Sequence, residues 1–362
     1  MRVRPDVDVI IIGAGLAGLM LAERLAVSGR RRMRAEVLEQ AAAINLSGRS
    51  WSWYEAGKPR TAFAASWPAW QVGGGNLTAG RRFADGRYGL MRSETVVQRA
   101  VDTIQASQDV ELRTGVTVNA MYRASGFVRL ETSDGTLTAL RVIDTRPAGA
   151  ELMDAARWVR TGVRAEVRAG SACFAPDTAI LVHRLRQEGR ALAFETILPL
   201  APDQAVVEAV RIAPSGDERR PEFDGALERI TGGGAADTGV RTRSASPLGL
   251  SDHWPLMAGP AHLAASRGAG LALVGAPGRD AHRALAWVEP AFGALVDGRQ
   301  PPGLHVQPVL AWLAGRAVIN RLMSRPARLV TMAERTAGDG LVRSLGGAGT
   351  VRGALNLLWA SR

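Results

Sequence analysis

The first forty residues alternate between apolar runs and turn residues in an order that predicts a strand, a helix and a second strand. Apolar residues run from Val7 to Ile12, a glycine-rich turn occupies 13–18, and apolar side chains then recur with helical spacing to about residue 28. Gly29 is expected to end that helix. Ala35–Glu39 has the pattern of a second strand and closes on an acid. We therefore predict a βαβ unit.

The glycines of the turn have the spacing of a dinucleotide site, Gly13-x-Gly15-x-x-Gly18, between a predicted strand and a predicted helix. Gly13 permits a tight turn, Gly15 lets the backbone approach a pyrophosphate, and Gly18 lets the helix pack closely. Glu39, at the end of the second strand, is placed to accept hydrogen bonds from an adenosine ribose. We predict that these four residues bind a dinucleotide.

A later strand favours FAD over NAD. Residues 142–146 form an apolar strand end that closes on Asp144, and in two-dinucleotide-fold flavoproteins such a strand returns beside the cofactor. The predicted fold is α/β. It consists of a Rossmann-type FAD-binding domain of the two-dinucleotide-fold flavoprotein type, an interleaved β-sheet substrate domain and a helical C-terminal tail. A glycine-rich turn that binds nothing is the alternative.

The rest of the chain divides by its pattern into four parts. The FAD domain is expected over 1–156, with an aromatic, glycine-rich excursion at 41–89, a helix at 91–105 and strands at 110–118, 127–132 and 137–143. A mainly β substrate domain follows at 157–249, with strands at 191–200 and 205–212. Residues 250–300 are expected to return to the FAD domain through a strand at 271–275. Residues 301–362 are predicted to be helical and amphipathic.

Composition narrows the classes of partner. Apolar residues make up 46% of 362, which permits a large core. The net charge is +11, but the basic residues are arginines spread along the chain, with Lys58 the single lysine, so no nucleic-acid surface is predicted. Attraction to an anionic membrane surface stays open. Cys173 is the only cysteine; it excludes an internal disulfide, fits a reducing cytoplasm and is expected to be a buried, inert thiol. No membrane span is predicted.

With these segments in place, the chain resembles the bacterial lycopene cyclases, flavoproteins that close rings on a linear carotene. Similarity runs in the same order through Ser50-Trp51-Ser52-Trp53, Trp67-Pro68-x-Trp70, and the segments at 81–82, 88 and 92–94. It continues through 142–146, then Leu198-Pro199-Leu200, and Val207-Glu208. The resemblance implies FAD in a reduced form, NAD(P)H as its reductant, and a hydrophobic polyene substrate taken from the membrane surface. The expected location is cytoplasmic, peripheral on the inner face.

Two departures from the family pattern fall at its site segments. The family's acidic motif has a second acid or Tyr after the Glu, whereas Ala209 follows Glu208 here. In the segment that lies over the flavin in the family, His282, Trp287 and Pro290 keep the spacing of His, an aromatic and Pro, but the family's Pro, Thr and Gly are lost. By resemblance, Gly275 and His282 join the predicted FAD contacts. His282 at the surface is the alternative.

Ring closure on a polyene needs a proton donor in an apolar site. A buried carboxyl suits this task because desolvation favours its protonated form. Glu208 is the candidate catalytic acid, and an exposed strand Glu is the alternative. Glu289 is expected to face solvent, the alternative being a replacement for the missing second acid. The tryptophans Trp51, Trp53 and Trp287 are candidates for a substrate pocket that stabilises cations, with core packing as the alternative.

The leading hypothesis is a flavin-dependent, redox-neutral cyclase that forms rings on the ends of a linear carotenoid. Three alternatives stay open. An FAD-dependent monooxygenase or prenyl reductase shares the FAD domain, a shorter isoprenoid is a competing substrate, and a non-catalytic paralogue would bind FAD or a carotenoid without turnover.

Overall fold

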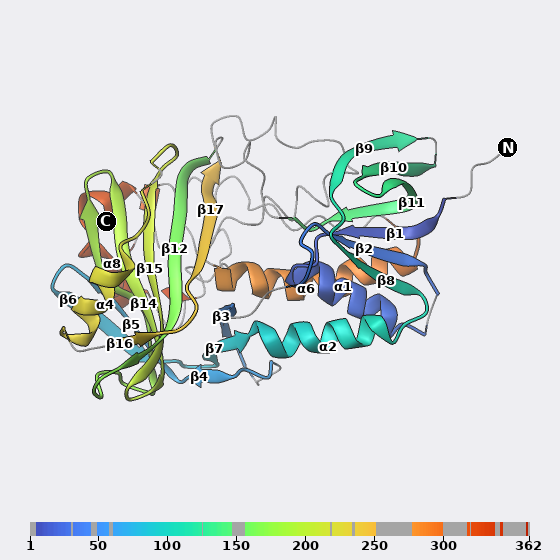
Figure 1. Ribbon diagram of the computed structural model, residues 1–362. Coiled ribbons are helices and arrows are strands. Elements are labelled where there is room, and N and C mark those ends of the chain that lie inside the picture. Colours follow the sequence, from blue (N-terminus) through green and yellow to red (C-terminus); the bar gives the residue numbers. More distant parts are fainter. Residues whose placement is uncertain are drawn as a thin grey trace.

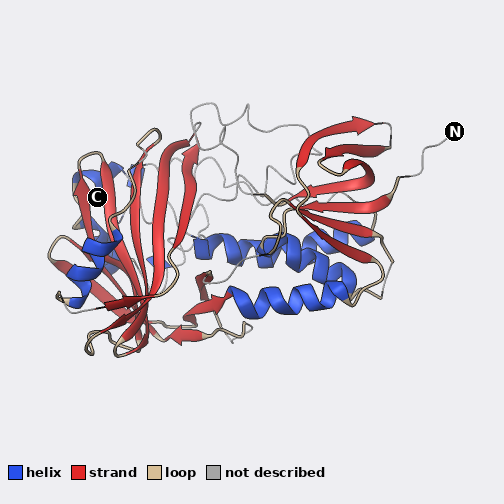
Figure 2. Cartoon of the chain, viewed as in Figure 1, coloured by secondary structure: helices blue, strands red, loops and turns tan. Residues whose placement is uncertain are grey.

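The computed structural model describes residues 5–29, 32–44, 49–57, 61–124, 126–146, 156–217, 219–233, 236–250, 277–299, 317–318, 320–336, 341–342 and 360. The described elements form two halves, each built on its own large sheet (Figure 1). Long helices lie under the sheet of the first half and extend toward the second (Figure 2).

The first half is a six-stranded sheet in the order β8-β2-β1-β11-β10-β9. Its strands are β1 (Val7–Ile12), β2 (Ala35–Glu39), β8 (Val110–Thr114), β9 (Val118–Ala124), β10 (Phe127–Thr132) and β11 (Gly135–Asp144). β1 pairs in parallel with β2 on one side and β11 on the other, and β2 pairs in parallel with β8. This arrangement confirms the predicted βαβ unit and the Rossmann-type fold.

Three helices form one apolar core with this sheet: α1 (Leu16–Ala26), α2 (Ser93–Gln105) and α6 (Pro277–Val296). They pack on one face because the inward positions of β1, Val9 and Ile11, are apolar and completely buried. The alternate positions, including Ile10 and Ile12, form a second core on the other face. Both faces of β1 are therefore covered from Val9 to Ile12, where its side chains are all apolar.

Two of the predicted elements contain a break that the sequence pattern did not show. The helix expected at 91–105 begins at Ser93, because Met91 and Arg92 still pair with β3 as the end of β7. The strand expected at 110–118 is divided into β8 and β9. The chain turns between them at Gly115, whose φ of 78° ends the extended backbone.

The described residues of the aromatic excursion at 41–89, together with the three residues that follow it, contain five strands that serve two sheets. They are β3 (Ser50–Glu55), β4 (Ala65–Trp67), β5 (Ala69–Gly74), β6 (Leu77–Arg82) and β7 (Arg87–Arg92). β3, β7 and β4 form a small sheet, whereas β5 and β6 join the edge of the large sheet of the second half, where β5 pairs in parallel with β13. The large sheet is thus built from two separate segments of the chain.

The large sheet has eight strands, in the order β16-β12-β15-β14-β13-β5-β6 with β17 also paired to β12. Its later strands are β12 (Ala156–Ala169), β13 (Thr178–Glu188), β14 (Ala191–Ala201), β15 (Gln204–Pro214), β16 (Ala236–Thr238) and β17 (Thr242–Leu250). β14 and β15 contain the two strands predicted in this region. Helix α4 (Phe223–Thr231) covers one face through an apolar core with β12 and β15.

Helix α8 (Arg328–Arg335) packs on β5 and β6 at the other end of that sheet. Its apolar side chains Leu329, Val330, Met332 and Ala333 are all buried. Part of the amphipathic C-terminal region is therefore helical, as predicted, but these side chains face the protein. No helix in the described part of the chain is long and apolar enough to cross a membrane. The strand expected at 271–275 lies outside the described residues.

Candidate functional site

The glycine-rich turn has the geometry that a dinucleotide needs. Gly13 has a φ of 97°, which favours glycine, and a Cβ at Gly18 would lie 2.0 Å from the carbonyl oxygen of Gly13. By contrast, a Cβ at Gly15 would meet nothing within 4 Å. The turn and the helix are therefore in close contact at Gly18, while open space faces Gly15 at the start of α1, where a pyrophosphate would meet the positive end of the helix dipole.

Glu39 is fixed at the end of β2 by two backbone donors. Its Oε2 accepts a hydrogen bond from the backbone N–H of Ala14 at 2.7 Å, and its Oε1 accepts one from that of Ala41 at 3.0 Å. The carboxylate is therefore held beside the glycine-rich turn, with lone pairs left for a ribose hydroxyl.

The end of β11 completes this site from the other side of β1. Thr145 donates its hydroxyl to the carbonyl oxygens of Ile12 and Gly13, each at 3.0 Å. Asp144 accepts hydrogen bonds from the guanidinium of Arg146 at 2.9 and 2.7 Å. That contact raises the pKa of Arg146, and burial partly opposes the rise. The Arg146 side chain lies 3.4 Å from the point where a Cβ on Gly13 would stand. Arg146, which the sequence offered only as the end of the 142–146 segment, thus lies against the glycine-rich turn.

These residues fit FAD on three independent points: open space at Gly15, a carboxylate held at the end of β2, and a cation beside the turn. Gly13, Gly15, Gly18, Glu39 and Asp144 are brought together, as expected. Gly275 lies outside the described residues. His282 lies on helix α6, and its side chain is outside the described part of the structure.

Glu208 is buried in the large sheet, with 5% of its surface exposed. On β15 it stands opposite Arg164 of β12, and its Oε1 accepts a hydrogen bond from Arg160 Nη2 at 3.0 Å. The exposed alternative is wrong. The expected apolar surroundings are only half right, because a guanidinium contact stabilises the ionised form of a carboxyl.

Glu208 belongs to a buried charged cluster, whose other members are Tyr88, Arg160 and Arg164. Arg160 and Arg164 are only 5% and 7% exposed. Burial lowers the pKa of Arg164, opposed by the charge of Glu208, and Arg164 Nη1 donates to the carbonyl oxygen of Ser50 at 3.2 Å. Gly162 between them leaves the necessary room, because a Cβ there would lie 2.4 Å from Glu208 Oε1.

Tyr88 brings the small sheet into the cluster. Burial raises the pKa of its hydroxyl, and the nearby Glu208 raises it further, while Ser52 and the two arginines oppose this change. The Tyr88 and Ser52 hydroxyl oxygens are 3.3 Å apart. A neutral phenol is therefore favoured. The sequence analysis did not single out Arg160 and Arg164. The available signal was that positions 160, 162, 164 and 166 alternate along a predicted β region and therefore share one face of the sheet.

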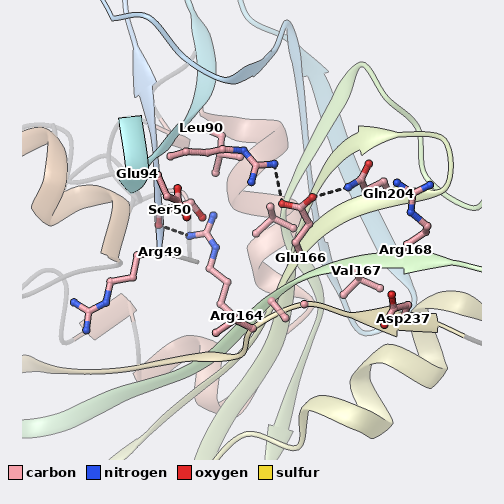
Figure 3. A pocket seen from close by; sticks show the side chains of 15 residues that line it. Arg49, Ser50, Leu90, Glu94, Arg164, Glu166, Val167, Arg168, Gln204 and Asp237 are labelled. Carbon is pink, nitrogen blue, oxygen red and sulfur yellow. Dashed lines mark hydrogen bonds and ion pairs between the residues drawn. The ribbon is translucent and has the colours of Figure 1, made fainter. Parts of the chain in front are cut away.

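The cluster borders a pocket of about 290 Å³ between the small and the large sheet, called the β12 pocket here (Figure 3). Arg164 extends along it toward Ser50, and Glu166 contacts both Arg92 at 2.8 Å and Gln204 at 2.5 Å. The pocket is lined by Arg49, Ser50, Leu90, Arg92, Glu94, Arg164, Ala165, Glu166, Val167, Arg168, Gln204, Val206, Asp237, Gly239 and Val240.

The three candidate pocket tryptophans lie together in the first half. Trp53 and Trp287 are 3% and 5% exposed in the core with α1, α2 and α6, and Trp51 packs against the same core. Trp53 makes an edge contact with Phe63, with 4.9 Å between ring centroids. They are packed side chains in this structure, and their part in a substrate pocket stays a prediction.

Two further expectations are settled by exposure. Glu289 faces solvent, as expected, in an ion pair with Arg24 at 2.6 Å. Cys173 is exposed, so the prediction of a buried thiol was wrong. It follows β12 on a segment where the backbone N–H of Cys173 is bonded to Pro202 and the side chain is left outside the core.

Comparison with solved structures places the fold among flavoenzymes. Aklavinone-11 hydroxylase with FAD and aklavinone is 14% identical, with a TM-score of 0.58 over 94% of this chain and 73% of that one. p-Nitrophenol 4-monooxygenase PnpA from Pseudomonas putida DLL-E4 is 16% identical, with a TM-score of 0.55 over 97% and 96%. Halogenase PltM in complex with phloroglucinol and FAD is 13% identical, with a TM-score of 0.56 over 96% and 84%. At these identities the likeness concerns the fold.

A search of curated proteins finds no match. The family comparison is specific: the model described as "Lycopene cyclase protein" matches residues 8–234. The matched segment contains the glycine-rich turn, Glu39, Asp144, the buried charged cluster and most of the large sheet. The chain therefore belongs to the lycopene cyclase family.

Proposed function

We propose that the protein is an FAD-dependent, redox-neutral cyclase that forms rings on the ends of a linear carotenoid. The observation that carries the proposal is the joint presence, inside the family match, of a dinucleotide turn open at Gly15 and a buried carboxyl at Glu208. The first supports a flavin and the second supports proton chemistry.

Gly13, Gly15, Gly18 and Glu39 would hold the pyrophosphate and ribose of FAD, and Arg146 would offset phosphate charge. When bound and reduced by NAD(P)H, FAD supplies an anionic ring system that stabilises positive charge near it without net oxidation of the substrate. Arg146 is already held by Asp144, so little ordering is required of it on binding.

Glu208 is the group we assign to proton transfer. In its protonated form it would give a proton to a terminal double bond of the polyene. After ring closure, the resulting carboxylate would take a proton from a neighbouring carbon. One carboxyl serving both steps leaves the composition of the polyene unchanged, as an isomerisation requires. Arg160 at 3.0 Å stabilises the carboxylate that exists between the two steps.

The test is expression in cells that accumulate lycopene, with product analysis by chromatography and mass spectrometry. A product with the mass of lycopene and a cyclic end group is expected. Reduced nicotinamide is counted in the purified reaction, where a cyclase consumes it only to reduce the flavin once. Stoichiometric consumption would instead identify a monooxygenase or a prenyl reductase, and absence of any isomer from long or short polyenes would identify a non-catalytic paralogue.

A further inference from the structure

One face of β12 carries hydrogen-bond donors that have no acceptor in the structure. Side chains alternate along a strand, so Trp158, Arg160 and Arg164 lie on the same face as Gly162. Their exposed fractions are 8%, 5% and 7%, so all three are more than nine-tenths buried. Among the described residues, four of their nitrogens have no hydrogen-bond partner: Trp158 Nε1, Arg160 Nη1, Arg164 Nε and Arg164 Nη2.

Such a group of donors is costly unless something accepts from it. A buried donor without a partner costs about 1–3 kcal/mol, and more when it is charged. Two other orphaned nitrogens, on Trp70 and Arg87, lie on different strands. Two of the four donors belong to Arg164, and of these three residues it is Arg164 that lines a pocket, so a ligand with acceptor atoms would be paired there.

The charges of the cluster give the sign of that ligand. Arg160 and Arg164 carry two positive charges, and Glu208 supplies one negative charge through its contact with Arg160. Burial keeps Tyr88 neutral. The lining of the β12 pocket holds four arginines, Arg49, Arg92, Arg164 and Arg168, against three carboxylates, Glu94, Glu166 and Asp237. Glu166 is engaged by Arg92 and Gln204. Within the described part of the chain, one buried positive charge of this cluster has no counter-ion, and an anion would balance it.

The β12 pocket gives this charge a place to meet a ligand. Arg164 lines it from the inside, and Arg49 and Arg168 lie on its exposed rim (Figure 3). Its volume of about 290 Å³ is at the lower end of the roughly 300–1,000 Å³ typical of small-molecule sites. It is therefore suited to an end group and not to a whole carotenoid.

We propose that the β12 pocket binds an anionic end group, a carboxylate or a phosphate, on the isoprenoid substrate, with Arg164 as its anchor. The inference rests on the proposed function and extends its substrate class from hydrocarbon polyenes to linear polyenes that carry an anionic group at one end. Lycopene has no acceptor atom and would leave Arg164 Nε and Nη2 unpaired.

The experiment measures binding to the FAD-loaded protein by titration calorimetry. The probes are retinoate, a polyene carboxylate; farnesyl diphosphate, an isoprenoid phosphate; lycopene in detergent; and inorganic phosphate. In Arg164→Met, retinoate or farnesyl diphosphate should bind at least about tenfold more weakly, as expected for loss of a charge-assisted hydrogen bond. Lycopene binding should be unchanged. Arg129→Met, an exposed arginine on β10, is the matched control.

Arg164→Met is expected to fold like the wild type, because the Arg160–Glu208 ion pair stays balanced when Arg164 is removed. A weaker binding of the probes would therefore not result from misfolding. The melting temperature of Arg164→Met should equal or exceed that of the wild type. Equal binding of both anionic probes by wild type and variant would overturn the inference, as would loss of FAD uptake in the variant or phosphate binding as tight as farnesyl diphosphate.

Bound FAD is measured in the same samples by its visible absorbance. A wild-type protein that takes up no FAD but binds the anionic probes through Arg164 would overturn the proposed function and support the pocket.

Discussion

Glu208 shows how a residue can be found from sequence while its surroundings are not. The resemblance through Leu198-Pro199-Leu200, which lies on β14, and through Val207-Glu208 on the neighbouring β15 singled out Glu208, and the structure decides between its buried and exposed alternatives. The ion pair with Arg160 depends on the register of β12 on β15, which brings together positions 48 residues apart. No local pattern encodes that register, so the balance between acid and base forms at Glu208 could not be predicted.

The ion pair makes a specific prediction for Glu208→Gln. This variant leaves two buried guanidiniums without a carboxylate, so its free energy of unfolding should fall by about 3–5 kcal/mol. The double variant Glu208→Gln/Arg160→Met should recover most of that loss in urea denaturation followed by tryptophan fluorescence. Both should lose roughly a hundredfold to ten-thousandfold in turnover. A single variant as stable as the wild type would contradict the buried pair.

The glycines of the dinucleotide turn should separate folding from cofactor binding. Gly15→Val places its side chain in open space, so the melting temperature should be almost unchanged while FAD uptake is lost. Gly18→Ala places a Cβ 2.0 Å from the Gly13 carbonyl oxygen, so it should lower the melting temperature itself. FAD absorbance and thermal unfolding measure the two effects. FAD bound normally by Gly15→Val would remove the turn from the cofactor site.

At the scale of elements, strands with a regular pattern were predicted closely and their long-range partners were not. β1, β2 and β10 have the predicted bounds because an apolar run or a two-residue period is local information. The pairing of β5 with β13 joins segments more than a hundred residues apart, and nothing within the 41–89 excursion indicates it. The same holds for α8, whose apolar face could meet either protein or lipid.

Helix α8 is expected to act as a structural element of the large sheet. Leu329 is 2% exposed, so Leu329→Ala should destabilise the protein by about 2–5 kcal/mol through lost burial and a cavity. Glu334→Ala, on the exposed side of the same helix, should change stability by no more than about 0.5 kcal/mol. Chemical denaturation compares the two. A Leu329→Ala variant with wild-type stability but reduced vesicle binding would mean that this face of α8 contacts the membrane and not the protein core.

At the scale of the whole molecule, the burial of α8 changes the expected mode of membrane contact. Four apolar side chains of this helix are buried and so are unable to insert into lipid. The chain carries a net charge of +11, which comes from arginines dispersed along its whole length. Contact with an anionic lipid surface should therefore be mainly electrostatic.

Electrostatic contact predicts a strong dependence on salt. The protein should sediment with vesicles that contain phosphatidylserine and not with neutral phosphatidylcholine vesicles. Raising the salt concentration to 1 M shortens the screening length from about 10 Å at 0.1 M to about 3 Å, so most of the protein should be released. Cosedimentation at a series of salt concentrations measures this. Binding to neutral vesicles that persists at 1 M salt would mean that an apolar segment inserts into the lipid, and the surplus of arginine would then not be what holds the protein at the membrane.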